Sequence, residues 1–141
     1  LQINIELKNS MLPYEGMEEK IIGLIRESGL QEHIVYSSFS ALSLEKVRRL
    51  EPGARIGMLD GKISDCLYKL KGGCGADDLH PSMYGIDLPP EKFAGFRVRA
   101  WGGGRLYPEK PTGNRLDLAA LERKGITDVF LNEPEAYCVE E

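Results

Sequence analysis

Apolar, strand-like runs alternate along this chain with helical patterns, at spacings of about twenty residues. Such alternation is typical of repeated strand–helix units that build a parallel sheet. It predicts an α/β fold, and because no linker or break in composition interrupts it, we expect residues 1–141 to form a single domain. The expected strands are 1–8, 33–39, 55–59, 76–79, 96–101 and 127–131.

The predicted helices fall between these strands, and their ends carry capping residues. Residues 17–28 repeat apolar side chains at helical spacing, and Gly29 follows in a position that closes a helix. Ser40 can cap the second helix, which Pro52 and Gly53 end. The remaining helices are expected near 63–70 and at 116–124.

The composition excludes several classes of protein. Hydrophobic residues make up 42% of the chain and charged residues 28%, as in an ordinary globular domain. No run approaches the roughly 18 to 20 apolar residues that span a bilayer, so we expect no membrane-spanning segment. The net charge of -4, with both signs interleaved, argues against a nucleic-acid surface, which needs a clustered basic face. A small-molecule partner is therefore expected.

The three cysteines suggest neither a disulfide framework nor a zinc site. Cys66, Cys74 and Cys138 are odd in number and form no Cys-x-x-Cys pair, so we expect free buried thiols. The sequence begins at Leu1, already inside a strand-like run, where a signal peptide would not be visible. The compartment is therefore left open.

The first strand carries the strongest chemical signal. Residues 3–8 alternate apolar and polar side chains, and the polar face carries Asn4, Glu6 and Lys8. In a barrel the apolar face would meet the surrounding helices, which leaves the carboxylate and the ammonium group pointing inward near the carboxyl end of the strand. Burying both is costly without a metal, a substrate or mutual pairing, and barrel enzymes place their sites at that rim. Glu6 and Lys8 are therefore candidate site residues. The alternative is an exposed edge strand whose polar face meets water.

Six segments of the chain carry a resemblance to a known family, and the first is the most specific. It consists of Asn4-Ile5-Glu6-Leu7-Lys8-Asn9 followed by Tyr14-Glu15-Gly16-Met17-Glu18-Glu19-Lys20. The other five are Val35-Tyr36-Ser37-Ser38-Phe39, Ile56-Gly57-Met58-Leu59, Ala76-Asp77-Asp78-Leu79-His80-Pro81, Val98-Arg99-Ala100-Trp101 and Ile126-Thr127-Asp128-Val129-Phe130-Leu131-Asn132-Glu133-Pro134. In this order they resemble strands three to eight of the glycerophosphodiester phosphodiesterase family.

The resemblance implies a (β/α)8 barrel of the TIM type, of which only strands three to eight are present here. It also implies hydrolysis of glycerophosphodiesters to an alcohol and glycerol 3-phosphate with a bound divalent cation, calcium or magnesium. Glu6 matches a metal ligand of the family, since a carboxylate suits a hard cation. Lys8 matches a lysine that can reach the phosphate. Phe39 and Trp101 match aromatic positions at the rim, where a ring can pack against the glycerol or the leaving group. Ordinary barrel packing is the alternative for these two rings.

The family's first strand ends in a His-Arg pair, and the segment after it supplies acidic metal ligands and a second histidine, none of which we find in this sequence. His33 lies at the start of its strand, and His80 matches a loop position. We therefore expect an incomplete catalytic domain, inactive alone, that a missing N-terminal segment or a second chain would complete. Residues 102–114 also depart from the family, and we expect a loop insertion there.

Two other interpretations remain. The chain can be a non-catalytic binding or scaffold module derived from the same barrel, or part of a related barrel phospholipase that uses a similar rim. A native start at Leu1 would favour the module, whereas a His-Arg strand encoded upstream would favour the enzyme.

Overall fold

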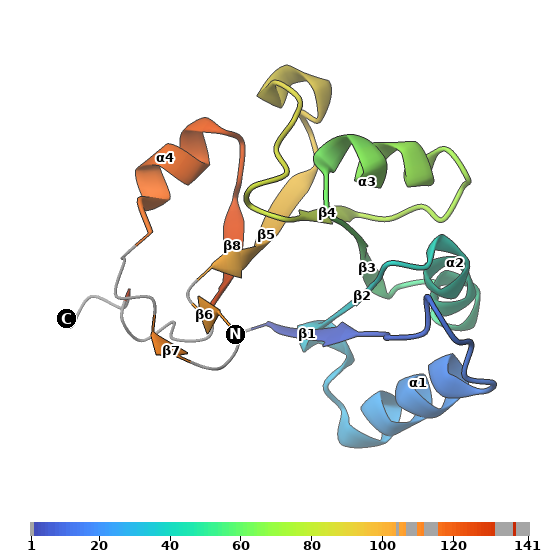
Figure 1. The fold of residues 1–141 in the computed structure, drawn as a ribbon. Coiled ribbons are helices and arrows are strands. Elements are labelled where there is room, and N and C mark those ends of the chain that lie inside the picture. Colours follow the sequence, from blue (N-terminus) through green and yellow to red (C-terminus); the bar gives the residue numbers. More distant parts are fainter. Residues whose placement is uncertain (1, 104, 107–109, 112–115, 132–136, 138–141) are drawn as a thin grey trace.

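The computed structural model describes residues 2–103, 105–106, 110–111, 116–131 and 137. Its main feature is a six-stranded parallel sheet whose strands follow one another in sequence order (Figure 1). This confirms the predicted α/β class and the sequential parallel pairing. The strands are β1 (Ile3–Glu6), β2 (Ile34–Ser38), β3 (Arg55–Asp60), β4 (Asp78–Pro81), β5 (Arg97–Gly103) and β8 (Asp128–Leu131).

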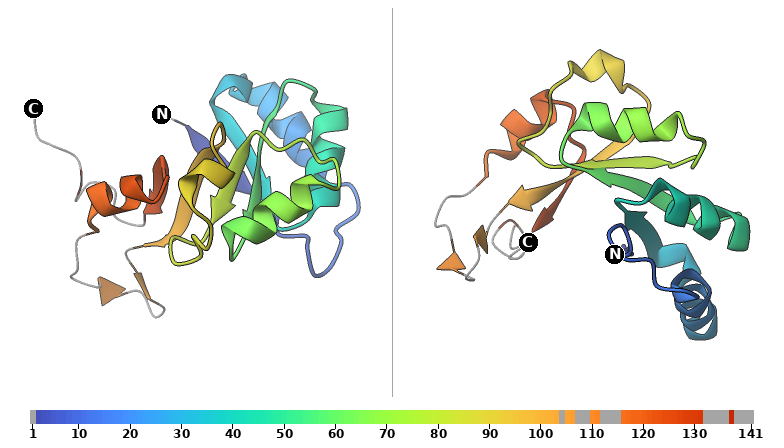
Figure 2. Two further views of the ribbon diagram at one scale, coloured as in Figure 1. Left: turned by 90° about the horizontal axis from the view of Figure 1, so that it is seen from above. Right: turned by 45° about the vertical axis from the view of Figure 1, so that its right-hand side comes forward.

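The sheet curls into a half-barrel with the helices round its outside (Figure 1). β1 and β8 form the two edges of the sheet. In the right-hand view of Figure 2, the blue first strand–helix unit and the orange-red last one lie at opposite ends of the curl. The helices are α1 (Met17–Ser28), α2 (Ala41–Leu50), α3 (Ile63–Leu70) and α4 (Leu118–Arg123), with 3-10 turns η1 (Gln31–His33) and η2 (Pro90–Lys92).

Local capping explains where the helices begin and end. The Ser40 side chain accepts a hydrogen bond from the Ser43 backbone N–H at 3.3 Å, as expected of an N-cap. Gly29 ends α1 with a φ of 71°, in the left-handed region that glycine adopts without strain. α4 begins two residues later than predicted because the Asp117 side chain caps it, accepting from the Ala120 N–H at 2.9 Å.

The apolar core lies between the sheet and the helices. Each strand sends alternate side chains toward the helices, and Leu7 extends this layer at 1% exposure, with Ile5 packed against it. Ile5 and Leu7 thus meet the helix side as expected, whereas Ile3, on the same face of this edge strand, is 42% exposed. Each fully buried aliphatic side chain contributes about 1.5–3 kcal/mol to folding. The centre of the layer is formed by Ile22, Tyr36, Leu44, Val47, Ile56, Met58, Ile63, Leu79 and Val98.

Two expectations are corrected in detail. β4 starts at Asp78 instead of residue 76, and just before it the Ile56 backbone N–H donates to the Asp77 carboxylate at 2.9 Å instead of to a strand carbonyl. In the stretch expected to be a loop, β5 continues to Gly103, and β6 (Arg105–Leu106) pairs antiparallel with β7 (Lys110–Pro111). The rest of residues 102–114 lies outside the described residues, as does the tail from 132 except Tyr137.

Two further expectations concern cysteines and membranes. Cys66 and Cys74 are free and buried as predicted, and burial raises the pKa of the Cys66 thiol to about 12, so it is an unreactive core residue. Cys138 lies outside the described part of the chain. None of the helices in the described ranges is long and apolar enough to cross a bilayer.

Candidate functional site

Glu6 and Lys8 lie at the carboxyl end of the first strand. Glu6 is the last residue of β1, and Lys8 follows two residues later. The Leu7 N–H donates to the Ser37 carbonyl at 2.7 Å, so the chain stays paired with β2 beyond Glu6, and Glu6 and Lys8 lie on the same side of it. Both side chains are exposed, and neither makes a hydrogen bond or ion pair with another described residue. Because Ile5 and Leu7 face the helices, the carboxylate and the ammonium group face the inside of the curl. Both charges are therefore accessible to a ligand at this rim.

The two predicted aromatic residues meet at the same end of the sheet. The rings of Phe39 and Trp101 contact edge to face, with centroids 6.3 Å apart and planes at 70°. Phe39 directly follows β2, and Trp101 lies in β5. Because β3 and β4 lie between β2 and β5 in the sheet, the contact of the two rings spans the inner face of the curl. The Trp101 indole N–H donates to the His80 carbonyl at 3.0 Å, and Lys69 donates to the Phe39 carbonyl at 2.9 Å. The pair is thus held in place by neighbouring backbone.

His80 lies inside the curl, within β4, and is completely buried. Its ring packs against the backbone of Gly57, and a Cβ added at Gly57 would collide with it. The ring also contacts the Phe130 ring edge to face, with centroids 5.2 Å apart. Burial, with a smaller contribution from Arg99, lowers the pKa of His80 to about 3. The ring is therefore neutral at physiological pH, and neither of its nitrogens has a partner among the described residues.

His33 lies in η1, directly before β2, and is exposed. It is therefore at the opposite end of the sheet from Glu6, as expected. Neither histidine of the chain lies at the rim that carries Glu6 and Lys8 in the described structure.

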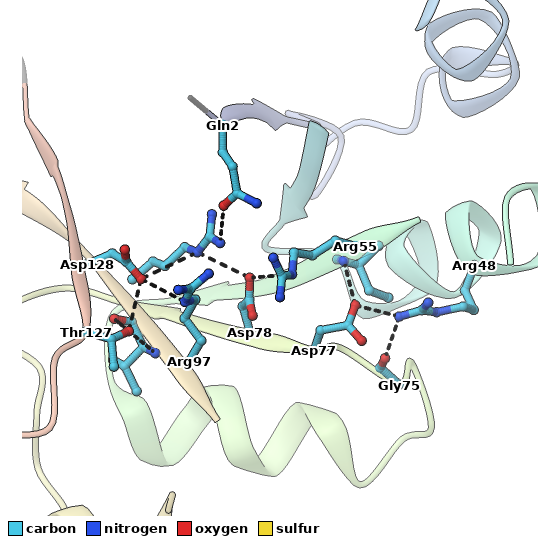
Figure 3. Close-up of polar contacts among 12 residues, drawn as sticks. Gln2, Arg48, Arg55, Gly75, Asp77, Asp78, Arg97, Thr127 and Asp128 are labelled. Carbon is cyan, nitrogen blue, oxygen red and sulfur yellow. Dashed lines mark hydrogen bonds and ion pairs between the residues drawn. The ribbon is translucent and has the colours of Figure 1, made fainter. Parts of the chain in front are cut away.

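The sequence analysis missed a charged cluster at the amino ends of the strands (Figure 3). Asp78 and Arg99, both buried, pair at 3.3 Å, and Arg55 approaches the same carboxylate at 3.6 Å. Arg99 also donates to the Gln2 side chain at 2.6 Å, across the inner face from β5 to the start of β1. Burial raises the pKa of Asp78, and the attraction of Arg99 and Arg55 opposes this rise.

This cluster lies at the end of the curl opposite Glu6. Arg97 adds a pair with Asp128 at 3.2 Å, at the starts of β5 and β8. In barrels of this type, residues at the amino ends of the strands serve stability instead of catalysis. Polar residues at alternate positions of β4 and β5 were the sequence signal that could have revealed the cluster.

Glu6 fits a hard divalent cation as a single ligand. Its carboxylate is exposed and has no partner among the described residues, and carboxylate oxygens are the donors that calcium and magnesium prefer. Such cations take about six or more oxygen ligands. The described residues contain no group of three His, Cys, Asp or Glu side chains that could hold a metal ion, so any further protein ligands would come from elsewhere.

Comparison with known proteins finds similar sequences among the members of one enzyme family. No protein-family model matches it. It is 30% identical over 135 residues, 94% of the chain, to a glycerophosphodiester phosphodiesterase of Caldanaerobacter subterraneus subsp. tengcongensis. The chain is therefore related to the glycerophosphodiester phosphodiesterases. It spans about half the length of the curated relatives it matches, 52% of the Caldanaerobacter protein.

Solved structures of glycerophosphodiester phosphodiesterases and related enzymes share the fold. A putative glycerophosphodiester phosphodiesterase from Galdieria sulphuraria, 19% identical, superimposes with a TM-score of 0.69 over 96% of this chain and 55% of that one. An Oleispira antarctica phosphodiesterase in complex with the product sn-glycerol-3-phosphate is 26% identical, with a TM-score of 0.63 over 96% of this chain and 53% of that one. The half-barrel therefore corresponds to about half of a (β/α)8 barrel.

Proposed function

We propose that this chain supplies part of the active site of a metal-dependent phosphodiesterase that cleaves glycerophosphodiesters to an alcohol and glycerol 3-phosphate. One observation carries the proposal: Glu6 and Lys8 are exposed, lie on one face at the carboxyl end of β1, and have no hydrogen-bond or ion-pair partner among the described residues. Elsewhere on the inner face, the buried charges pair with one another. A carboxylate and an ammonium group left free at a barrel rim suit a cation and a phosphate.

Each residue then has a chemical role. Glu6 would be one ligand of calcium or magnesium, and the bound cation would polarise a phosphoryl oxygen and offset the charge that develops on it. Lys8 would bring a second positive charge to the phosphate. Phe39 and Trp101, whose rings meet at this end, would pack against the glycerol or the leaving alcohol.

The histidines favour a second candidate for the chain alone, a binding or scaffold module without turnover. His80 is buried and neutral and His33 lies at the far end, so neither is placed to activate water or protonate a leaving alcohol. General acid–base catalysis is typically worth about a hundred- to ten-thousand-fold in rate. We therefore propose that the isolated chain has no appreciable phosphodiesterase activity and that residues outside it complete the site.

The proposal is tested by hydrolysis of glycerophosphocholine, with calcium or magnesium and with a chelator as control. The purified chain is compared with any longer product of the same gene. Metal-dependent turnover is expected only in a longer product, and Glu6→Gln should weaken its dependence on the cation. Glu32→Gln, at an exposed position beside His33, is the matched control. Unchanged cation dependence in Glu6→Gln would remove Glu6 from the site, and rapid hydrolysis by the isolated chain would refute the need for outside residues.

A further inference from the structure

A buried carboxylate lies behind the rim, on the helix side of the sheet. Glu18 belongs to the first turn of α1 and is only 4% exposed. It accepts hydrogen bonds from Asn9 at 2.7 Å and from Ser43 at 2.5 Å, and it pairs with Lys46 at 3.1 Å. Burying a carboxylate is costly unless it is paired and hydrogen-bonded, and these three donors meet that need.

The carboxylate is ionised in the folded protein. Burial opposes ionisation, but the hydrogen bond from Ser43, a backbone N–H and Lys46 outweigh it, so the pKa of Glu18 is lowered. Hydrogen bonds to a charged acceptor are about twice as strong as those between neutral groups. The Glu18 carboxylate therefore binds Asn9, Ser43 and Lys46 strongly and fixes their positions.

Its partner Asn9 connects this anchor to the end of β1. The Asn9 amide also donates to the Ser43 hydroxyl at 2.8 Å, and its carbonyl oxygen lies 3.3 Å from the Ser38 hydroxyl. The Ser38 hydroxyl in turn lies 2.9 Å from the Leu7 carbonyl, to which it donates. The Leu7 N–H is already held by the Ser37 carbonyl at 2.7 Å.

Leu7 is the residue between Glu6 and Lys8. Its N–H and carbonyl are both bound to β2, and Asn9, one residue beyond Lys8, is bound to α1 and α2 through Glu18 and Ser43. The backbone that carries both candidate site residues is thus fixed on either side. Neither side chain has a partner of its own among the described residues, so this backbone is what sets their direction.

We propose that Glu18 is a positioning residue that, through Asn9, holds the backbone of residues 6–9 so that Glu6 and Lys8 project into the rim. The role of Glu18 follows from contacts within the chain, whereas the use of Glu6 and Lys8 rests on the proposed function. Glu18 itself does not touch the ligand. It acts by keeping the chain extended beyond Glu6, the last residue of β1 that pairs with β2. A cation and a phosphate can then contact both charges without a rearrangement of residues 6–9.

The chain offers a matched pair of variants. Glu19 pairs with the same Lys46 at 2.9 Å but is 48% exposed and has no contact with Asn9. Glu18→Gln and Glu19→Gln each remove one charge beside Lys46, and only the first disturbs the link to Asn9. Asn9→Ala breaks the link while leaving the Glu18 charge in place, and it serves as the second variant if Glu18→Gln does not fold.

The first measurement is amide hydrogen exchange of Leu7 by NMR in the full 141-residue chain. Loss of a charged hydrogen bond should speed exchange at Leu7 by about ten- to a hundredfold in Glu18→Gln and in Asn9→Ala. Glu19→Gln should exchange as the wild type does. Equal exchange rates at Leu7 in Glu18→Gln, Asn9→Ala and Glu19→Gln would overturn the proposal. A uniform increase in the exchange rates of all the strands would also overturn it, because that indicates a general loss of stability.

The second measurement separates positioning from the proposed function. Mn²⁺ is titrated as a paramagnetic probe, and broadening of the Glu6 amide signal is followed. Weak binding at Glu6 in the wild type should fall several-fold in Glu18→Gln and stay unchanged in Glu19→Gln. If the wild type shows no broadening at Glu6, the proposed cation site fails, while the exchange of Leu7 still decides whether Glu18 positions the strand.

Discussion

Gly57→Ala should destabilise the protein although alanine suits a strand better than glycine does. Gly57 lies in β3 with ordinary strand backbone, so the substitution strains no dihedral angle. An added Cβ would overlap three atoms of the His80 ring, which is completely buried and packed edge-on against Phe130. The ring cannot turn into solvent, so it must shift within a packed interior.

The expected cost is that of overpacking, about 1–3 kcal/mol, which for a chain of this size lowers Tm by about 2–12 °C. Urea denaturation followed by circular dichroism at neutral pH measures the free energy of unfolding directly. Gly53→Ala is the control, because a Cβ at Gly53 meets nothing within 4 Å. That variant should change the free energy of unfolding by no more than about 0.5 kcal/mol.

A double-mutant cycle identifies His80 as the cause. His80→Ala removes the ring that the new methyl group would strike, so Gly57→Ala should cost little or nothing in that background. The coupling energy between the two substitutions should then approach the full cost of Gly57→Ala alone. The reasoning is refuted if Gly57→Ala is neutral in the wild type, or equally destabilising whether or not His80 is present.

Three further predictions concern the inner face and a helix end. Arg99→Met should cost about 3–5 kcal/mol at neutral pH, because it leaves the buried Asp78 carboxylate without its nearest partner. Burial raises the pKa of Asp78, so the loss should shrink as the pH is lowered and the carboxyl group takes up a proton; equal losses at neutral and acidic pH would count against this. His80, with its pKa lowered from 6.5 to about 3 in the folded protein, should stay neutral in NMR titrations from roughly pH 8 to pH 5, and a titration midpoint of the ring in that range would contradict this. The free energy of unfolding should fall as the pH drops below 6.5, because only the unfolded chain then takes up the proton. Asp117→Ala should cost about 0.5–2 kcal/mol in urea denaturation through loss of the cap on Ala120, and a neutral result would show that α4 does not depend on the cap.

The order and type of the elements could be predicted from the sequence because they depend on local patterns. α1 and α3 begin and end at the predicted residues, since apolar spacing and Gly29 mark α1 and the spacing of Ile63 and Cys66 marks α3. Two boundaries differ where a side chain binds the backbone. Asp117 caps α4, and the Asp77 carboxylate accepts the Ile56 N–H just before β4 begins.

Contacts across the inner face could not be predicted in the same way. Gln2 and Arg99 lie 97 residues apart in the sequence, and the edge-to-face contact of Phe39 with Trp101 joins strands that are not neighbours. The period of two assigns each side chain to a face of its strand. Which side chains then meet depends on how strongly the sheet curls, and that is a property of all six strands together.

The curl also gives the two ends of the inner face different chemistry. At the amino end, Arg99 and Asp78 are buried and bind each other, so these two charges are paired within the chain. At the carboxyl end, Glu6 and Lys8 are both exposed, and neither makes a hydrogen bond or ion pair with another described residue. Two residues apart on one face, they can both contact a single phosphate with its cation. This contrast supports the proposed site at the carboxyl end, because no described residue pairs with the two charges there.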